Sequence, residues 1–190
     1  DIEESVRHKT FIGCFNYAMV MGYHTAAYPK GKEPESWAEF WDIKAFPGPR
    51  TLADMATGAP DIEFALLADG VLMDKLYPLD IDRGFKSLSR VRPAITKFWD
   101  TGALSVQMLA DKEVVLGSLW STRLMVAMNK GAQVGAQWNQ NAVLGQAYGV
   151  PVGSHNVEAA FAFIDFSLQP HIQSAWLKPY NGIPVNQKSY

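Results

Sequence analysis

Apolar and polar positions along the chain follow two patterns, short apolar runs and longer stretches with helical spacing. Short runs of apolar residues between Gly, Pro and Asn predict strands over residues 10–23, 50–53, 113–120, 134–138 and 145–150. Apolar residues at helical spacing predict helices just after Ser36, over residues 61–68, 81–98, 121–130 and 157–168, and from Pro170. Strands that alternate with helices indicate an α/β fold with a mostly parallel central sheet flanked by helices.

Two sequence signals fix where helices are expected to begin. Ser36 and Glu39 fit a capping box, in which a Ser hydroxyl and a Glu carboxylate satisfy each other's backbone donors. Ser121 is placed to cap the helix that follows the strand over residues 113–120. In parallel sheets, ligands bind beyond the carboxyl ends of the strands. The corner at residues 120–123 is therefore the first place to look for a ligand site.

The composition is that of an ordinary globular chain. Its 190 residues are 48% hydrophobic and 19% charged, and 17 basic against 19 acidic side chains give a net charge of −2. No block of five Lys or Arg residues occurs, so nucleic acid and anionic membranes are not expected as partners. The apolar runs are too short to cross a bilayer, and the N-terminal residues do not form a signal peptide. We expect that any export signal has been removed or was never included.

Residues typical of catalysis or metal binding are scattered. The four histidines lie far apart, and the one cysteine, Cys14, can form neither an intrachain disulfide nor a thiolate cluster. Neither a G-x-S-x-G turn nor a G-x-x-x-x-G-K-[ST] phosphate loop occurs. We interpret Asp54 and Asp61 as helix-end or solvated acids. We expect no metal, no cofactor and no enzymatic activity, although a triad of residues remote in sequence stays open.

Aromatic residues point instead to binding. Six Trp, seven Tyr and ten Phe exceed what a core of this size needs, and aromatic faces line clefts that bind small organic solutes. Trp37, Trp41 and Trp176 lie on amphipathic segments and are expected in the core. Trp99 and Trp138 are open between core and cleft.

The corner at residues 120–123 combines an aromatic ring with a cation. Trp120 ends a strand that reads as buried, which favours a place in a cleft. Arg123 lies in the first turn of the next helix, where its charge opposes the helix dipole. We expect a compensating anion there, either a neighbouring acid or the carboxylate of a ligand.

Six stretches form a further pattern that is weak in each part and fairly specific in combination. They occur in order along the chain, at residues 34–48, 64–71, 76–83, 112–120, 157–170 and 182–186. Together they resemble the bacterial ABC-importer solute-binding proteins of the spermidine/putrescine type. The resemblance implies a type II periplasmic binding protein, whose two lobes close on a solute and deliver it to a membrane permease. It also implies a periplasmic location and a monomer in the full-length form.

The resemblance also implies how the chain divides into domains. Proteins of this type are considerably longer than 190 residues, and the match begins near their first inter-lobe crossing. Residues 25–143 would then form one complete lobe of the C-terminal type. Residues 1–24 and 144–190 would supply the inter-lobe crossings and part of the first lobe, so the chain is expected to be truncated.

On the same resemblance, the cleft tryptophan of the G-x-x-W strand falls on Trp120. Polyamine binders hold amino groups with carboxylates, but residues 57–60 contain no acid, and Gln146 stands where an acid is expected near the second crossing. The W-x-x-R pattern of Trp120 and Arg123 is instead similar to relatives that take amino acids such as 4-aminobutyrate. A dication needs buried anions to offset its desolvation, so a small carboxylate-bearing solute is favoured.

Further ligand candidates and other functions stay open. Trp99, expected in the loop before Gly102, and Tyr180, beside the turn at residues 182–186, are additional cleft candidates, and Gln146 is equally a surface amide. A polyamine binder of the same family is the nearest alternative. A ligand-sensing effector domain of a transcription regulator or an enzyme on the same scaffold are the others.

Overall fold

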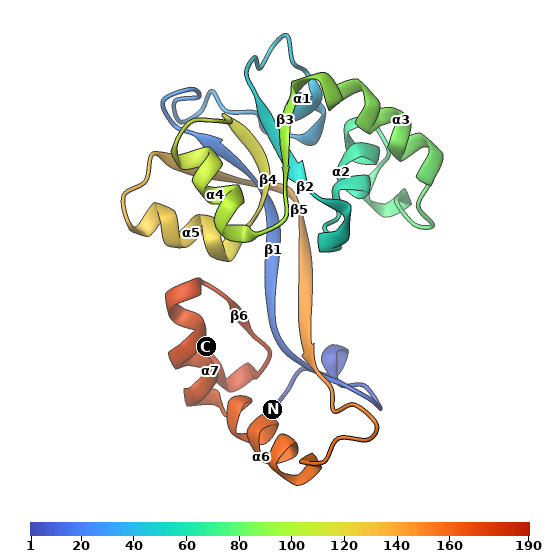
Figure 1. Ribbon diagram of the computed structural model, residues 1–190, viewed down its shortest axis with the longest axis vertical. Helices are drawn as coiled ribbons and strands as arrows, with labels where there is room; N and C mark the ends of the chain where they lie inside the picture. Colours follow the sequence, from blue (N-terminus) through green and yellow to red (C-terminus); the bar gives the residue numbers. More distant parts are fainter. The chain divides into compact units, whose positions relative to one another are not determined.

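A computed structural model describes all 190 residues, which form two compact units (Figure 1). The terminal unit combines the two ends of the chain, residues 1–18 and 143–190, and the central unit comprises residues 19–142. No helix in the chain has the length and apolar character needed to span a membrane.

Parallel strands organise the central unit. Its strands are β2 (Arg50–Ala53), β3 (Ile95–Trp99) and β4 (Leu116–Trp120), which lie in the order β3-β2-β4 and run parallel. β1 (Ile12–His24) pairs with β4 in the antiparallel sense, and β5 (Val134–Tyr148) follows β1 in the strand order. The expectation of an α/β fold with a mostly parallel central sheet is confirmed.

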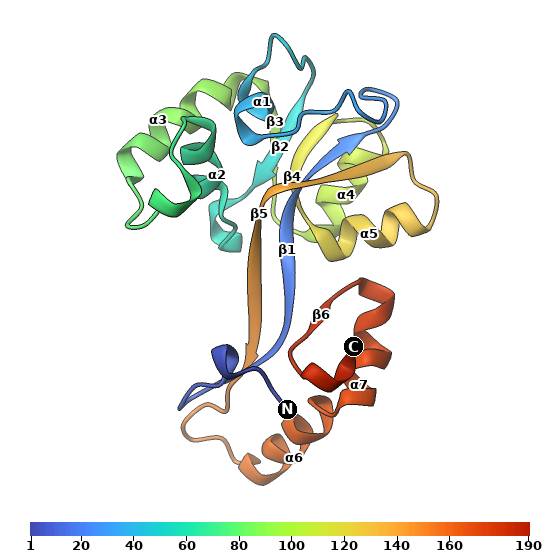
Figure 2. The ribbon, with the colours of Figure 1, turned by 180° about the vertical axis from the view of Figure 1, so that it is seen from behind.

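Helices flank both sides of this sheet. α2 (Asp61–Ala68) and α3 (Ile81–Val91) pack together on one side, and α4 (Gly102–Ala110) and α5 (Ser121–Asn129) on the other (Figures 1 and 2). α1 (Trp37–Trp41) is capped by the Ser36 hydroxyl, which accepts the Glu39 N–H at 3.2 Å. Short 3₁₀ turns occupy Glu4–Val6, Met55–Thr57, Met73–Lys75, Arg92–Ala94, Lys178–Tyr180 and Gln187–Ser189.

The terminal unit has a smaller core of Cys14, Leu168 and Val185, beneath α6 (Val157–Ser167) and α7 (Pro170–Leu177). Here β6 (Ile183–Pro184) pairs with β1. Gln173 is buried and links the two strands, because its Nε2 donates to the Cys14 carbonyl at 2.7 Å and its Oε1 accepts the Val185 N–H at 3.1 Å. α6 leaves large apolar side chains half-exposed, namely Phe161, Phe163 and Phe166.

One predicted helix is shorter than expected. The helix expected over residues 81–98 ends at Val91, and residues 95–99 form β3. Pro93 explains the break, since the residue before a proline is disfavoured in helical conformation and proline lacks an N–H donor. Trp99 therefore ends a strand and does not lie in a loop.

Other differences are smaller. The strands expected over residues 134–138 and 145–150 are one continuous strand, β5. Ser121 is the first residue of α5, and Trp120 occupies the cap position. α4 was not expected, although Thr101 caps it by accepting the Leu104 N–H at 3.3 Å.

A buried cation joins α1 and the turn after it to the sheet. The Arg50 side chain is completely buried at the start of β2. Its Nε donates to the Phe40 carbonyl at 2.8 Å, its Nη1 to the Gly48 carbonyl at 2.5 Å, and its Nη2 to the Phe46 carbonyl. Burial lowers the pKa of the Arg50 guanidinium. Backbone carbonyls therefore satisfy the buried guanidinium in place of an acidic side chain. These hydrogen bonds hold the loop against β2.

We predict that Arg50→Met lowers the free energy of unfolding by about 3–5 kcal/mol, because the three carbonyls lose their buried donor. Urea denaturation followed by circular dichroism measures the change. Arg83→Met is the matched control, since the Arg83 to Asp69 ion pair is partly exposed and its loss should cost about 1 kcal/mol or less. Equal losses in the two variants would contradict this account of Arg50.

Candidate functional site

The carboxyl ends of the parallel strands meet at one edge of the central unit. Ala53 at the end of β2 pairs with Trp99 at the end of β3, and β4, which is parallel to β2, ends at Trp120. This edge is where ligands bind in open α/β sheets. The strand register thus brings two of the sequence-predicted ligand residues, Trp99 and Trp120, to one place.

Trp99 lies in the core behind Trp120. Its side chain is completely buried, and its indole N–H donates to the Ser118 carbonyl at 2.8 Å. The rings of Trp99 and Trp120 meet edge to face, with centroids 5.2 Å apart and an interplanar angle of 79°. Trp120 is itself partly exposed. Trp99 therefore acts as the support that orients Trp120, which is the ring of the pair that solvent reaches.

Arg123 is exposed in the first turn of α5 and has no acidic partner within 4.0 Å. The ion pairs of the central unit involve other residues, namely Lys75 with Asp74, and Arg83 and Arg90 with Asp69. Of the two anions expected near Arg123, the neighbouring acid is thus absent. The cation is available to an external carboxylate, with which an Arg guanidinium forms two parallel hydrogen bonds.

The start of α4 lies against the same corner. A Cβ atom on Gly102 would lie 2.6 Å from Cε3 of Trp120 and 3.0 Å from Cγ of Arg123. Only a residue without a side chain permits this approach. The first turns of α4 and α5 consequently both lie at the corner, and each contributes a partial positive charge at its N-terminus. Arg123 and the two helix N-termini therefore place positive charge beside the Trp120 ring.

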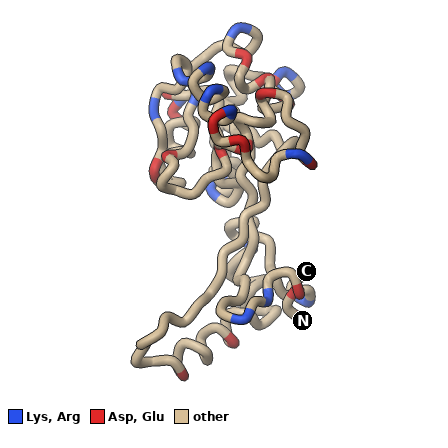
Figure 3. The backbone as a smooth tube through the Cα atoms, turned by 90° about the vertical axis from the view of Figure 1, so that its right-hand side faces the viewer, with Lys and Arg blue, Asp and Glu red and all other residues tan.

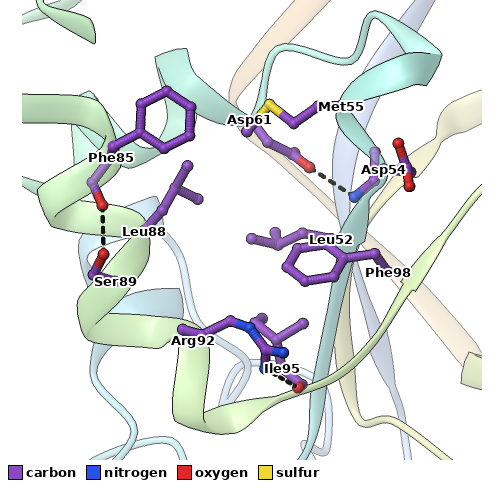
Figure 4. A pocket seen from close by; sticks show the side chains of 11 residues that line it. Leu52, Asp54, Met55, Asp61, Phe85, Leu88, Ser89, Arg92, Ile95 and Phe98 are labelled. Carbon is purple, nitrogen blue, oxygen red and sulfur yellow. Dashed lines mark hydrogen bonds between the residues drawn. The ribbon is translucent and has the colours of Figure 1, made fainter. Parts of the chain in front are cut away.

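A separate pocket of about 430 Å³ lies between α3 and the strands β2 and β3 (Figure 4). Neither Trp120 nor Arg123 lines it. Its wall is mostly apolar and comprises Leu52, Ala53, Asp54, Met55, Asp61, Phe85, Leu88, Ser89, Arg92, Ile95 and Phe98. The pocket lies beside β2 and β3, whereas the corner follows β4.

Asp61 is a buried acid at the first position of α2, on the wall of this pocket. Its Oδ2 accepts the Ala53 N–H at 2.7 Å, and its Oδ1 is buried without a hydrogen bond of normal geometry. Burial raises the pKa of Asp61 to about 7, against the opposing effects of the Ser118 hydroxyl and the Ala53 N–H. The interpretation of Asp61 as a helix-end acid agrees with this position, but the side chain is not solvated.

The other two predicted ligand residues belong to the terminal unit. Gln146 is exposed on β5, and its Nε2 donates to the Tyr17 hydroxyl at 3.4 Å. Tyr180 is half-exposed at the end of a 3₁₀ turn. A second pocket of about 470 Å³ in this unit includes neither residue, and His8, Lys9, Thr10, Phe11, Ile12, Tyr148, Gly149, Val150, Phe161, Ile164 and Asp165 line it.

Charge is distributed evenly in the central unit. Lys and Arg residues are interspersed with Asp and Glu residues along its backbone (Figure 3). No group of three or more His, Cys, Asp or Glu residues is arranged to hold a metal ion. At the strand ends the central unit thus offers an aromatic ring and an unpaired guanidinium after β4, and the exposed acids Asp54 and Asp100 directly after β2 and β3.

Comparison with known proteins finds a matching family and similar proteins. Residues 6–190 match the family model described as bacterial extracellular solute-binding protein. The chain is 31% identical over 181 residues to a gamma-aminobutyric acid-binding protein of Pseudomonas aeruginosa. An ABC transporter substrate-binding protein from Bradyrhizobium japonicum superposes with a TM-score of 0.90 at 36% identity. A structure described as the Atu4243-GABA receptor superposes with a TM-score of 0.89, also at 36% identity.

These relatives are longer than the chain. The matches cover 93% of the chain but 50% of the Pseudomonas protein, and 99% of the chain but 57% of each of the two solved chains. The chain thus spans about half the length of the relatives that it matches.

Asp61 should make stability depend on pH. Between about pH 4 and pH 7 the unfolded chain releases the Asp61 proton and the folded chain retains it, so the free energy of unfolding should fall as pH rises, by up to about 4 kcal/mol. Asp61→Asn keeps the acceptor for the Ala53 N–H and should lack this decrease. Denaturant unfolding of both proteins at pH 4.5, 6 and 7.5 measures the difference.

The control is Asp54→Asn, which neutralises an exposed acid of the same pocket. Its unfolding free energy should follow the pH dependence of the unmodified chain. If Asp61→Asn did the same, the carboxyl group of Asp61 would not be the source of the decrease.

Proposed function

The chain belongs to the family of bacterial extracellular solute-binding proteins, and we propose that it forms the carboxylate-reading lobe of a periplasmic protein that supplies an ABC importer. On this proposal, residues 25–143 are the complete lobe. The protein binds its solute without transforming it and delivers it to a membrane permease. The names of the relatives support this role, since two of them bind gamma-aminobutyric acid by description and one is an ABC transporter protein.

The proposed solute is a small amino acid with a terminal carboxylate, of the 4-aminobutyrate type. The observation that carries this proposal is the exposed Arg123 guanidinium, which has no acidic partner and lies beside the partly exposed Trp120. A carboxylate can bind Arg123 in a bidentate manner, and the methylene groups of the solute can pack on the indole ring. Gln146 and Tyr180 of the terminal unit stay predicted ligand residues.

A polyamine fits this corner less well. A dication that loses water on binding needs carboxylates around it. The unpaired charge beside Trp120 is the Arg123 guanidinium, and the first turns of α4 and α5 add to it, whereas the exposed acids Asp54 and Asp100 follow β2 and β3. An anionic group is therefore the better partner for this part of the protein.

Tryptophan fluorescence of the complete natural polypeptide that contains these residues, titrated at fixed salt, tests the proposal. We expect saturation with 4-aminobutyrate, and much weaker binding of its amide 4-aminobutanamide and of putrescine. Arg123→Ala should weaken 4-aminobutyrate binding by about 1.5–3 kcal/mol, roughly 10- to 100-fold, because a charge-assisted hydrogen bond is lost.

Lys130→Ala is the matched control, because it removes an exposed cation just beyond the opposite end of the same helix. It should leave 4-aminobutyrate binding unchanged. Saturation with putrescine alone, or equal losses for carboxylate and amide in Arg123→Ala, would overturn the proposal.

A further inference from the structure

Gly102 contacts both groups of the proposed site although it has no side chain of its own. It is buried at the start of α4, and the position of its missing Cβ is 2.6 Å from Cε3 and 3.0 Å from Cζ3 of Trp120. The same position is 3.0 Å from Cγ of Arg123. Carbon atoms that are not bonded stay about 3.5–4.0 Å apart, so any other residue at position 102 would displace the ring or the Arg stem.

The backbone of Gly102 does not itself require glycine. Gly102 lies in a regular helical turn, whereas six other glycines of the chain have a positive φ. Alanine is the better helix former at such a position. The reason for glycine at position 102 is therefore the space that Trp120 and Arg123 occupy.

Packing on Trp99 limits how Trp120 can respond to an added methyl group. Its ring already rests edge to face on Trp99, which is completely buried and anchored by the hydrogen bond to the Ser118 carbonyl. A Cβ at position 102 would overlap the ring at Cε3 and Cζ3. We expect the Trp120 ring to turn and the Arg123 stem, whose Cγ is 3.0 Å from the same Cβ position, to shift as well.

We infer that Gly102 is a positioning residue that sets the spacing between Trp120 and Arg123, and thereby selects solutes with a carboxylate at the end of a short methylene chain. This inference rests on the proposed function. A bidentate contact with Arg123 and a packing contact with Trp120 can form together only when the two side chains keep a fixed distance. Gly102 preserves the distance between Trp120 and Arg123 because it has no side chain that would push either of them away.

The test compares Gly102→Ala with Gly84→Ala in the complete natural polypeptide. Gly84 is a suitable control because it is also a buried helical glycine, in α3, whose Cβ would lie 2.8 Å from a side-chain atom of Ile62. We expect Gly102→Ala to weaken 4-aminobutyrate binding at least tenfold and to weaken 4-aminobutanamide binding much less. Gly84→Ala should leave both within twofold of the unmodified protein.

A second measurement reports the position of Trp120 without any ligand. Two indole rings that are close and not parallel give a coupled circular dichroism signal. The difference between the spectra of the unmodified protein and Trp120→Leu gives the signal of the Trp99 and Trp120 pair. Gly102→Ala should change that part, and Gly84→Ala should not. In the Trp120→Leu background, Gly102→Ala should weaken binding far less than it does in the unmodified protein. This non-additivity is expected if Gly102 acts on binding through the Trp120 ring.

The outcomes separate the two claims. If the unmodified protein shows no preference for the carboxylate over the amide, the proposed function fails, and the dichroism still tests whether Gly102 positions Trp120. If the preference exists but Gly102→Ala binds like the unmodified protein, the inference is overturned and the proposed function stands. An unchanged dichroism signal in a folded Gly102→Ala variant would overturn the inference as well, and so would independent effects in the double variant.

Discussion

The hydrogen bond from the buried Trp99 indole to the Ser118 carbonyl is the interaction on which the candidate site depends. It ties the side chain at the end of β3 to the backbone of β4, the strand that lies beyond β2 in the sheet. The bond and the complete burial of the ring restrict the rotation of Trp99, and Trp99 in turn supports the ring of Trp120. A partly exposed aromatic ring with such a support keeps its orientation before any ligand arrives, which lowers the entropy cost of binding.

Two arginines of the central unit show how the same side chain serves opposite purposes. Arg50 is buried, and the carbonyls of a loop satisfy it, so it acts entirely within the fold. Arg123 is exposed and has neither an acid nor a carbonyl as a hydrogen-bonded partner in the structure. Burial and partners, rather than residue type, therefore distinguish a structural cation from one that is available to a solute.

The sequence predicted the parts of the fold that local patterns determine. The Ser36 cap, β2 and α2 follow from residues adjacent in sequence, and so they were found. β3 was missed because its middle residues are exposed and because the preceding helical periodicity continued past Pro93. An edge strand of this kind carries little apolar signal of its own.

The residues of the candidate site also differ in how far local sequence patterns reveal them. Trp120 and Arg123 could be proposed from the sequence because a strand end and a helix start are visible there, whereas the burial of Trp99 depends on the register between β2 and β3. Gly102 gave only a weak signal, a glycine directly after the capping Thr101, and glycine at such a position is ordinary. Its importance arises from the contact between α4 and the corner, which no local pattern encodes. Burial of Asp61 is equally non-local, since it requires α2 to pack on the sheet.

The proposed sign of the solute rests on groups that all lie within the central unit. Arg123 supplies a full charge, and the helix N-termini of α4 and α5 supply partial charges that point to the same corner. Acids and bases are interspersed along the backbone of this unit (Figure 3), and screening by salt makes the nearest groups the main source of the local field. On the proposed function, the anionic end of the solute would interact favourably with all three groups. On the proposed function, a dication would meet the Arg123 charge beside Trp120, whereas a carboxylate would pair with it, so the groups nearest the ring are what favour an anionic end.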